Sequence, residues 1–375
     1  MAPIRLGVVG LSAEGSWASR SHLPHLLQSD DYAITALQNS SAEAASRAVA
    51  KYQLPGKVAC YGSISELVDD ANVDMVVVSV KVPHHYELLK AALAAPTKKD
   101  VFVEWPLAAN LREAEELTGL AAARGVRTMV GLQARQNPSI RRARELVASG
   151  ALGDILGTTM LGNGLVFGPQ VTSDLLYMLP IEHGANLLTI PAGHAIDALC
   201  YVLGEFKHLH ATLANNRPEL SLVDSDGNHV RSVAKSAHDY VAVEGTLLRG
   251  GVASVVYQGG SSLTGKDFYW EINGSKASLI LEADSGHVQM FHPTLKLATP
   301  PSSSHSVYGS GPGPKVEEVL VDKAANLSYN VGLAWDAFVD KGPGSVTTFE
   351  DALVRHRMID AIYKSNETGT RQSYL

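Results

Sequence analysis

Hydrophobic and polar residues alternate in two different ways along the chain, and the pattern changes near residue 136. Before that point, apolar runs of strand length are followed by stretches in which apolar residues recur every three or four positions. Such strand-length runs cover residues 4–10, 32–37, 59–61, 73–80, 101–104 and 126–131. Strands that alternate with helices form βαβ units with right-handed crossovers onto one parallel sheet. The pattern therefore predicts an α/β Rossmann domain with a parallel, doubly wound sheet over residues 1–135.

After residue 136 the strands follow one another directly, separated by polar turns. Consecutive strands predict an antiparallel or mixed sheet, so residues 136–375 are expected to form an α+β domain with an open-faced, mostly antiparallel sheet. The expected strands are 155–164, 208–216, 239–248, 252–258, 269–272 and 277–281, with helices at 186–203, 328–339 and 349–365. Segment 298–314 is rich in Pro, Ser and Gly and is predicted to be a long surface loop.

Composition narrows the class of protein. A chain of 375 residues, 45% of them hydrophobic, is long enough for two domains. The net charge of −7 gives no basic patch for nucleic acid, and no apolar run approaches the roughly 20 residues of a membrane span. The N-terminus runs straight into a strand, without a signal peptide pattern. With only two cysteines, Cys60 and Cys200, we expect a cytoplasmic protein without a disulfide framework.

A glycine-rich turn follows the first predicted strand. Its sequence from Gly10 to Gly15 reads Gly-x-Ser-x-x-Gly, a dinucleotide-binding pattern in which Ser12 replaces the second glycine. The first glycine permits the tight turn, and the small second residue lets the backbone approach a pyrophosphate at the helix N-terminus. The alternative is a glycine-rich turn that binds no ligand.

The end of the second strand bears on which dinucleotide would bind. NAD-specific sites usually place a carboxylate there for the ribose hydroxyls, but residues 38–41 read Gln-Asn-Ser-Ser. Asn39 and Ser40 suit a plain ribose or a phosphorylated one, so NAD and NADP both remain open. Lys81 and His85 follow the fourth strand-like run, where they would either contact the cofactor or begin the next helix.

The stretch from Val101 to Ala108 ends a buried strand with Glu104, Trp105 and Pro106. A carboxylate at the carboxyl end of a parallel strand faces the crevice in which open α/β sheets bind ligands. Pro106 removes a backbone donor and ends the strand. The alternative is an ordinary strand–turn–helix junction with Trp105 as a core residue.

The order of these motifs resembles the Gfo/Idh/MocA family, which includes glucose–fructose oxidoreductase and inositol dehydrogenase. The resemblance covers segments 10–15, 73–86, 102–108, 131–138, 193–197 and 348–365. It implies an NAD(P)-dependent oxidoreductase acting on CH–OH groups of a sugar-like or other oxygenated small molecule, in a homodimer or homotetramer. The implied cofactor-binding residues are Gly10, Ser12, Gly15, Ser16, Trp17, Asn39, Ser40, Lys81, His85, Glu104 and Trp105.

Two departures from the family pattern concern catalysis. Enzymes of the family usually have Glu-Lys-Pro where this chain has Trp105, and an aspartate where it has Ile190, four residues before His194. Neither Trp nor Ile transfers a proton, which hydride transfer to or from an oxygenated carbon requires. The same replacements resemble the fungal branch of galactose/lactose-metabolism regulatory proteins. That resemblance implies a non-catalytic dinucleotide-binding regulator with a protein partner, in the nucleus as well as the cytoplasm.

Three residues of the second domain are candidates for a substitute proton relay. Tyr177, His183 and His194 precede or lie on the predicted helix 186–203, and Asp197 follows His194 by one turn. The alternatives are that Tyr177 only lines a pocket and that the histidines are satisfied core residues. No compact cluster of Cys, His and carboxylates predicts a metal site. We favour the oxidoreductase, with the regulator as the alternative.

Overall fold

A computed structural model describes residues 2–301, 313–322 and 326–375 of the chain. The chain forms two compact units. The first contains Met1–Gln136, Glu182–Ala185 and Asn326–Arg357, and the second contains Asn137–Ile181, Asn186–Ala325 and Met358–Leu375. The first break after Gln136 falls one residue from the expected domain boundary, but a C-terminal segment returns to the first unit.

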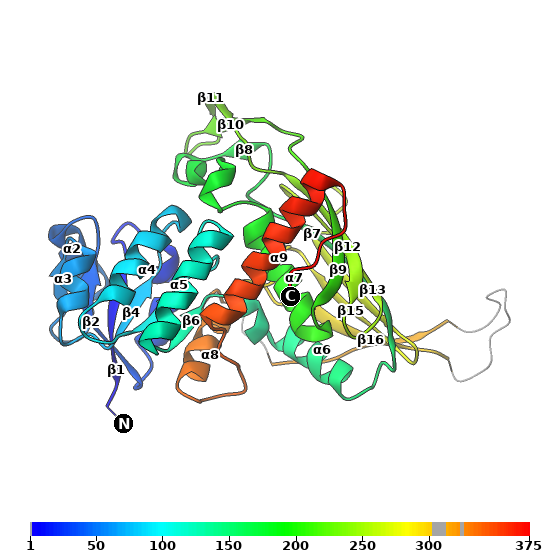
Figure 1. Cartoon of the computed structure of the whole chain (residues 1–375), viewed down its shortest axis with the longest axis horizontal. Helices are drawn as coiled ribbons and strands as arrows, with labels where there is room; N and C mark the ends of the chain where they lie inside the picture. The colour runs from blue at the N-terminus through cyan, green and yellow to red at the C-terminus, as the bar shows by residue number, and fades with distance from the viewer. Residues whose placement is uncertain (1, 302–312, 323–325) are drawn as a thin grey trace. The chain divides into compact units, whose positions relative to one another are not determined.

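Six parallel strands form the sheet of the first unit, in the order β3-β2-β1-β4-β5-β6 (Figure 1). This order, which reverses at β1, is that of a dinucleotide-binding Rossmann fold and confirms the predicted parallel sheet. The central strands are buried on both faces, as their continuous apolar runs predict. The strands are β1 (Ile4–Val9), β2 (Tyr32–Gln38), β3 (Ala59–Tyr61), β4 (Met75–Val78), β5 (Asp100–Val103) and β6 (Thr128–Val130).

Helices cover both faces of this sheet. Helices α3 (Ile64–Asp69), α4 (His85–Ala94) and α5 (Leu111–Arg124) lie side by side on one face (Figure 1). The other face packs against α1 (Leu23–Leu26), α2 (Ala42–Tyr52) and α8 (Tyr329–Phe338). The shorter turns of the unit are η1 (Ala18–His22), η2 (Val82–His84), η3 (Gln133–Gln136) and η5 (Ile181–His183), which begins one residue before the unit's short segment.

The returning C-terminal segment completes the core of the first unit. Trp335 on α8 is fully buried and joins a cluster with Leu6, Met75 and Phe102 of the sheet. Its main-chain carbonyl accepts a 2.6 Å hydrogen bond from the hydroxyl of Tyr32. Thr347 extends the hydrogen bonding of β6, because the Val130 N–H donates to its carbonyl at 2.8 Å. The first unit is therefore built from two distant parts of the chain.

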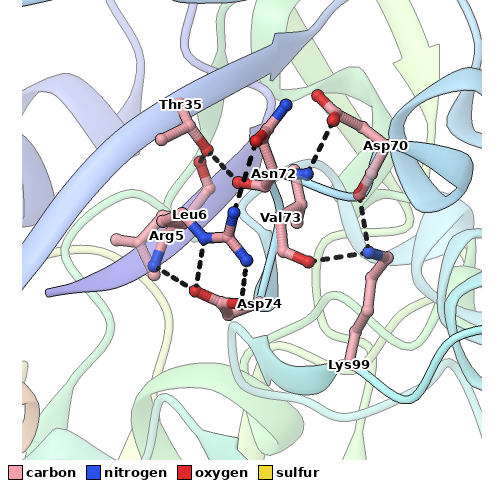
Figure 2. Close-up of polar contacts among 8 residues, drawn as sticks. All are labelled: Arg5, Leu6, Thr35, Asp70, Asn72, Val73, Asp74 and Lys99. Atoms are coloured by element: carbon pink, nitrogen blue, oxygen red, sulfur yellow. Dashed lines mark hydrogen bonds and ion pairs between the residues drawn. The ribbon is translucent and has the colours of Figure 1, made fainter. Parts of the chain in front are cut away.

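Hydrogen bonds from charged side chains connect the amino ends of the central strands (Figure 2). Arg5 donates to both carboxylate oxygens of Asp74, at 2.9 and 2.7 Å, and thereby joins β1 to the residue before β4. The buried Lys99 ammonium donates to the carbonyls of Asp70 and Val73 at 2.8 and 2.7 Å. In an open α/β sheet the ligand crevice lies at the opposite, carboxyl edge, so these contacts support the fold.

The second unit contains a sheet of eight strands in the order β17-β16-β15-β14-β7-β13-β12-β9 and a small sheet, β11-β10-β8 (Figure 1). Among the described strands of the large sheet only β7 and β13 pair in parallel, so the predicted mostly antiparallel sheet is confirmed. Its strands are β7 (Ile155–Asn163), β9 (Phe206–Ala214), β12 (Tyr240–Leu247), β13 (Val252–Gln258), β14 (Phe268–Gly274), β15 (Ser278–Ala283), β16 (Thr294–Thr299) and β17 (Lys315–Glu318).

The pattern of apolar residues did not predict five of the second unit's strands. Three of them form the small sheet, β8 (Gln170–Val171), β10 (Glu219–Val223) and β11 (His229–Ala234), and the other two are β16 and β17. Strand β11 exposes most of its residues and β17 all four, so neither carries an apolar alternation. Of the predicted loop 298–314, residues 302–312 lie outside the described residues, and its first two residues belong to β16.

One apolar helix runs through the second unit. Asn186 begins it by accepting hydrogen bonds from the N–H groups of Leu188 and Thr189. A stretch from Ile181 to Leu203 is long and apolar enough to span a membrane, but 89% of its most apolar window is buried in the protein, as in a core helix. The helical elements outside the first unit are α6 (Pro138–Ala148), η4 (Ser173–Met178), η6 (Leu188–Ala192), α7 (Gly193–Leu203) and α9 (Phe349–Thr368), which starts in the first unit.

Candidate dinucleotide-binding and catalytic site

The turn after β1 has the backbone geometry that a phosphate-binding turn needs. Gly10 has a φ of +98°, in the left-handed region that favours glycine. A Cβ atom added there would lie 2.3 Å from the carbonyl oxygen of Ser79, so no other residue fits. Gly15 also has a positive φ, of +92°, but the space beside it is open. The start of the turn, at Gly10, thus packs tightly against the residue after β4, whereas its end, at Gly15, has open space beside it.

Ser12 shapes the middle of this turn. Its carbonyl accepts hydrogen bonds from the Gly15 N–H at 3.2 Å and from the Tyr52 hydroxyl at 2.7 Å. Its Oγ accepts from the Glu14 N–H at 3.1 Å. The serine that replaces the second glycine therefore stabilises the turn with its own side chain.

Ser16 and Trp17 lead from the turn into η1. The Ser16 N–H donates to Ser19 Oγ, which in turn donates to the Ser16 carbonyl, both at 2.9 Å. Trp17 is half-buried and packs against the core of the first unit. A π-helical turn, η1, begins directly after Trp17.

Asn39 and Ser40 follow the carboxyl end of β2. The Asn39 amide nitrogen donates to the Leu11 carbonyl at 2.9 Å, which fixes the side chain beside the glycine-rich turn. Ser40 is exposed, and Ser41 caps helix α2 by accepting from the Ala44 N–H. None of these side chains carries a charge, so nothing in residues 38–41 repels a ribose phosphate.

Ser79 and Lys81 follow the carboxyl end of β4, where Ser79 lies against the same turn, and His85 begins helix α4. The buried Ser79 Oγ has no hydrogen-bond partner in the described parts of the chain. Lys81 is exposed. His85 is fully buried, and its Nδ1 and Nε2 face the carbonyls of Pro106 and Val80 at 2.9 and 3.0 Å. Burial lowers the pKa of His85, and a neutral imidazole has a single N–H, so the ring donates to one of these two carbonyls and supports the backbone there.

A hydrogen-bonded chain fixes Glu104 at the carboxyl end of β5. The Trp335 indole N–H donates to His22 Nδ1 at 3.0 Å, so that nitrogen carries the lone pair. His22 Nε2 then carries the proton and donates to Glu104 Oε1 in a short contact. The two side chains are 3% and 13% exposed, so the carboxylate is buried with a partner. Gly131 makes room for it, because an added Cβ would lie 2.7 Å from Glu104 Oε2.

Trp105 occupies the core of the first unit. The residue is 5% exposed, and its ring packs against His356 on α9 with centroids 5.1 Å apart. Burial lowers the pKa of His356 to about 3, and the neighbouring His85 adds to this effect. His356 is therefore neutral at physiological pH and serves as an aromatic packing partner of Trp105.

The three candidate proton-transfer residues lie in different parts of the fold. Tyr177 is half-buried on η4 of the second unit, and burial with the nearby Asp174 raises its pKa to about 12. His183 is half-buried in the short segment that belongs to the first unit. Tyr177 is thus protonated across the neutral range and has the chemistry of a proton donor.

His194 lies on α7 in the interior of the second unit. Burial lowers its pKa to about 3, and the neighbouring His287 contributes. His287 accepts from the Gln289 amide through Nδ1 at 3.1 Å, so its Nε2 carries the proton and donates to the Gly164 carbonyl at 2.9 Å. A neutral His194 can accept a hydrogen bond at pH 7 but is not a general acid there.

A nicotinamide dinucleotide fits what the first unit offers. The glycine turn provides backbone close to a helical segment, and Ser79 has a buried hydroxyl with unused hydrogen-bonding capacity. The dinucleotide would be held by the turn after β1, by the segment after β2 and by Ser79. Within the described ranges, no group of three His, Cys, Asp or Glu side chains could hold a metal ion.

Comparisons with known proteins agree with this geometry. The family model described as "Oxidoreductase family, NAD-binding Rossmann fold" matches residues 4–132, and "Gal80p, C-terminal domain" matches residues 138–283. The "Dehydrogenase aclE" of Aspergillus oryzae is 36% identical over 99% of this chain and 98% of that protein. The chain belongs to the Gfo/Idh/MocA family. This Gfo/Idh/MocA protein is also 32% identical, over 98% of its length and 94% of the relative's, to the galactose/lactose metabolism regulatory protein GAL80 of Saccharomyces cerevisiae.

Solved structures show the same fold over the whole chain. A super-repressor mutant of Gal80p from Saccharomyces cerevisiae superposes with a TM-score of 0.88 at 31% identity, over 99% of this Gfo/Idh/MocA protein and 98% of that chain. A levoglucosan dehydrogenase in complex with NADH and L-sorbose has a TM-score of 0.76 at 18% identity, covering 99% of each chain, and shares the fold. Full-length relatives therefore include both a dehydrogenase and a regulator.

The sequence did not predict the residues that pack against Glu104 and Trp105. His22, Trp335 and His356 are far from Glu104 and Trp105 in the sequence, and each sits within an apolar helical pattern that gives no sign of its partner. Ser79 was hidden in the predicted strand 73–80. The sequence held one clue to Ser79: the first glycine of the turn, Gly10, implies that another segment of backbone packs closely against it.

Proposed function

We propose that the protein is an NAD(P)-dependent oxidoreductase acting on a CH–OH group, or the corresponding carbonyl, of a sugar-like or other oxygenated small molecule. The observation that carries this proposal is the glycine turn after β1, in a chain similar to a dehydrogenase along its whole length. A bound nicotinamide dinucleotide would supply or accept the hydride. The chain itself must then move one proton to or from the substrate oxygen.

Tyr177 is our first candidate for that proton transfer. Its pKa of about 12 keeps the phenol protonated, so it can donate to a carbonyl oxygen that gains negative charge during reduction. His194 is neutral and suits a hydrogen-bond acceptor for a substrate hydroxyl, and His183 is the half-buried third candidate. Trp105 stands where the family resemblance places a lysine, so we assign it no proton-transfer role.

A regulator that binds a dinucleotide without turnover is the second candidate. The burial of Trp105 against His356 favours it, because this packing leaves no ionisable group at the position of the family's lysine. The similarity to Gal80p over the whole chain supports it as well. In this case the protein would bind a protein partner instead of a small-molecule substrate.

Two measurements separate these functions. The first is a calorimetric titration of the full chain with NAD, NADH, NADP and NADPH, which determines the preferred dinucleotide. The second follows NAD(P)H absorbance with a panel of sugars, polyols and ketones. Turnover that falls at least about 100-fold in Tyr177→Phe, but not in the half-buried control Tyr201→Phe, supports the oxidoreductase and its proton donor.

Each other outcome has a definite meaning. Turnover that Tyr177→Phe leaves unchanged keeps the oxidoreductase and removes Tyr177 from the proton relay. Tight binding without turnover on the whole panel favours the regulator. Absence of binding for all four dinucleotides contradicts both functions.

A further inference from the structure

Two side chains from beyond β2 hydrogen-bond to the main chain of the glycine-rich turn. The Asn39 amide nitrogen donates to the Leu11 carbonyl at 2.9 Å, and the Tyr52 hydroxyl donates to the Ser12 carbonyl at 2.7 Å. Because a carbonyl oxygen only accepts, the amide nitrogen of Asn39 must be the atom that faces Leu11. Tyr52 ends helix α2, and its half-buried ring packs against the core of the first unit, which fixes the position of the hydroxyl. Two successive carbonyls of the turn are therefore held by side chains.

Fixing these carbonyls also fixes the direction of the next two N–H groups. The peptide bonds of the turn are trans, so the C=O of one residue and the N–H of the next point in opposite directions. The N–H groups of Ser12 and Ala13 therefore point away from Asn39 and Tyr52. Neither N–H has a hydrogen-bond partner among the residues that the structure describes. Successive backbone N–H groups of this kind form a concavity that binds anions.

We propose that Tyr52 and Asn39 are positioning residues of the dinucleotide site. Through the carbonyls that they bind, they aim the following two N–H groups at the pyrophosphate, and neither side chain has to touch the phosphates. This inference rests on the proposed function, and it holds for the oxidoreductase and for the regulator alike. It also gives Asn39 a role other than ribose binding, the usual role of a side chain at the end of the second strand.

Tyr52→Phe tests the hydroxyl, because it keeps the ring and removes one hydrogen bond to the turn. Binding of NADH to the full chain is followed by fluorescence, and ADP is titrated as a competitor because it carries a diphosphate but no nicotinamide. We expect Tyr52→Phe to weaken NADH and ADP by the same factor, about tenfold, the value of one hydrogen bond. In the matched control Tyr86→Phe, the lost hydroxyl donates to Glu116 at 2.7 Å between α4 and α5, so neither affinity should change.

Asn39→Asp separates positioning from ribose binding, because the two roles predict opposite results. A carboxylate at the end of the second strand usually serves NAD binding through the ribose hydroxyls, so that role predicts tighter binding. If Asn39 positions the turn, the carboxylate cannot donate to the Leu11 carbonyl, and NADH should bind about tenfold more weakly. The control Asn72→Asp adds the same charge at the amino edge of the sheet, where Asn72 accepts from Arg5, and should leave the affinity unchanged (Figure 2).

Circular dichroism verifies that each variant is folded. The inference is overturned if Tyr52→Phe binds NADH and ADP as the wild type does, if it weakens NADH but not ADP, or if Asn39→Asp binds NADH as tightly as the wild type or more tightly. It is also overturned if ADP does not compete with NADH in the wild type, because the turn would then not hold the diphosphate. These results leave the proposed function intact, whereas a wild type that binds none of the four dinucleotides contradicts both.

Discussion

At the scale of single residues, Gly10 shows how the proposed dinucleotide site depends on backbone conformation, because only glycine fits at this position of the turn. An alanine there places its Cβ 2.3 Å from the Ser79 carbonyl and is strained by the positive φ, so the turn must move away from β4. We expect Gly10→Ala to destabilise the protein by about 2–4 kcal/mol and to abolish dinucleotide binding. Urea unfolding and calorimetry measure the two effects.

Gly227→Ala is the matched control for Gly10→Ala. Gly227 has a φ of +82° with nothing within 4 Å of an added Cβ, so this change imposes strain without a clash. It should cost about 1 kcal/mol and leave dinucleotide affinity unchanged. Equal effects of the two substitutions on affinity would contradict the role assigned to Gly10.

Trp105 gives a second prediction for a single residue, because the family resemblance places a lysine at its position. The indole is 5% exposed and packs against His356, so Trp105→Lys would replace this packing with a buried ammonium group. We expect a loss of at least about 3 kcal/mol in the free energy of unfolding and no gain in turnover. Trp105→Phe, which keeps an aromatic ring, should lose less than half of that. A stable, more active Trp105→Lys variant would contradict this packing argument.

At the scale of elements, the first unit depends on a segment from the other end of the sequence. Trp335 is fully buried in the core beneath β1, β4 and β5, and Thr347 pairs with the edge of β6. We expect residues 1–136 alone not to fold cooperatively, because the truncation exposes this core and leaves His22 without its indole donor. The measurement is thermal unfolding followed by circular dichroism. A cooperative transition of the fragment at the temperature of the intact chain would contradict this expectation.

The elements also mark what could be predicted from the sequence. The parallel strands and most helices were found because their apolar periodicity is strong, and Glu104 was placed correctly at the end of β5. The missed strands β10 and β11 belong to a small sheet, and β11 shows only one buried position. The contacts of Glu104 with His22, and of Trp105 with His356, depend on long-range packing that no local pattern records.

At the scale of the whole molecule, two buried histidines make stability depend on pH. Burial lowers the pKa of His194 and His356 from 6.5 to about 3 in the folded state. As the pH falls below 6.5, the unfolded chain therefore binds protons that the folded chain does not, and stability is lost until about pH 3. His356→Phe should reduce the slope of unfolding free energy between pH 5.5 and 4 by up to about 1.4 kcal/mol per pH unit. A slope in His356→Phe equal to that of the wild type would refute the assignment.

Assembly is the second property at this scale. One face of the eight-stranded sheet exposes Leu161, Tyr240 and Val252, which are 44%, 38% and 54% exposed. The family resemblance leads us to expect a dimer or tetramer that covers this face. The double substitution Leu161→Glu and Val252→Glu should then yield a folded monomer in light scattering after gel filtration. A wild-type monomer, or an oligomer that tolerates both glutamates, would contradict this expectation.

The return of Asn326–Arg357 to the first unit also has a consequence during protein synthesis. Strands β1 to β6 leave the ribosome first, but the helix that contributes Trp335 follows only after most of the second unit has been translated. The part of the sheet face that α8 later covers therefore stays exposed until α8 is synthesised, although domains ordinarily fold in order from the N-terminus. Chaperones that bind apolar surfaces would therefore bind the nascent chain at the part of the sheet that α8 later covers.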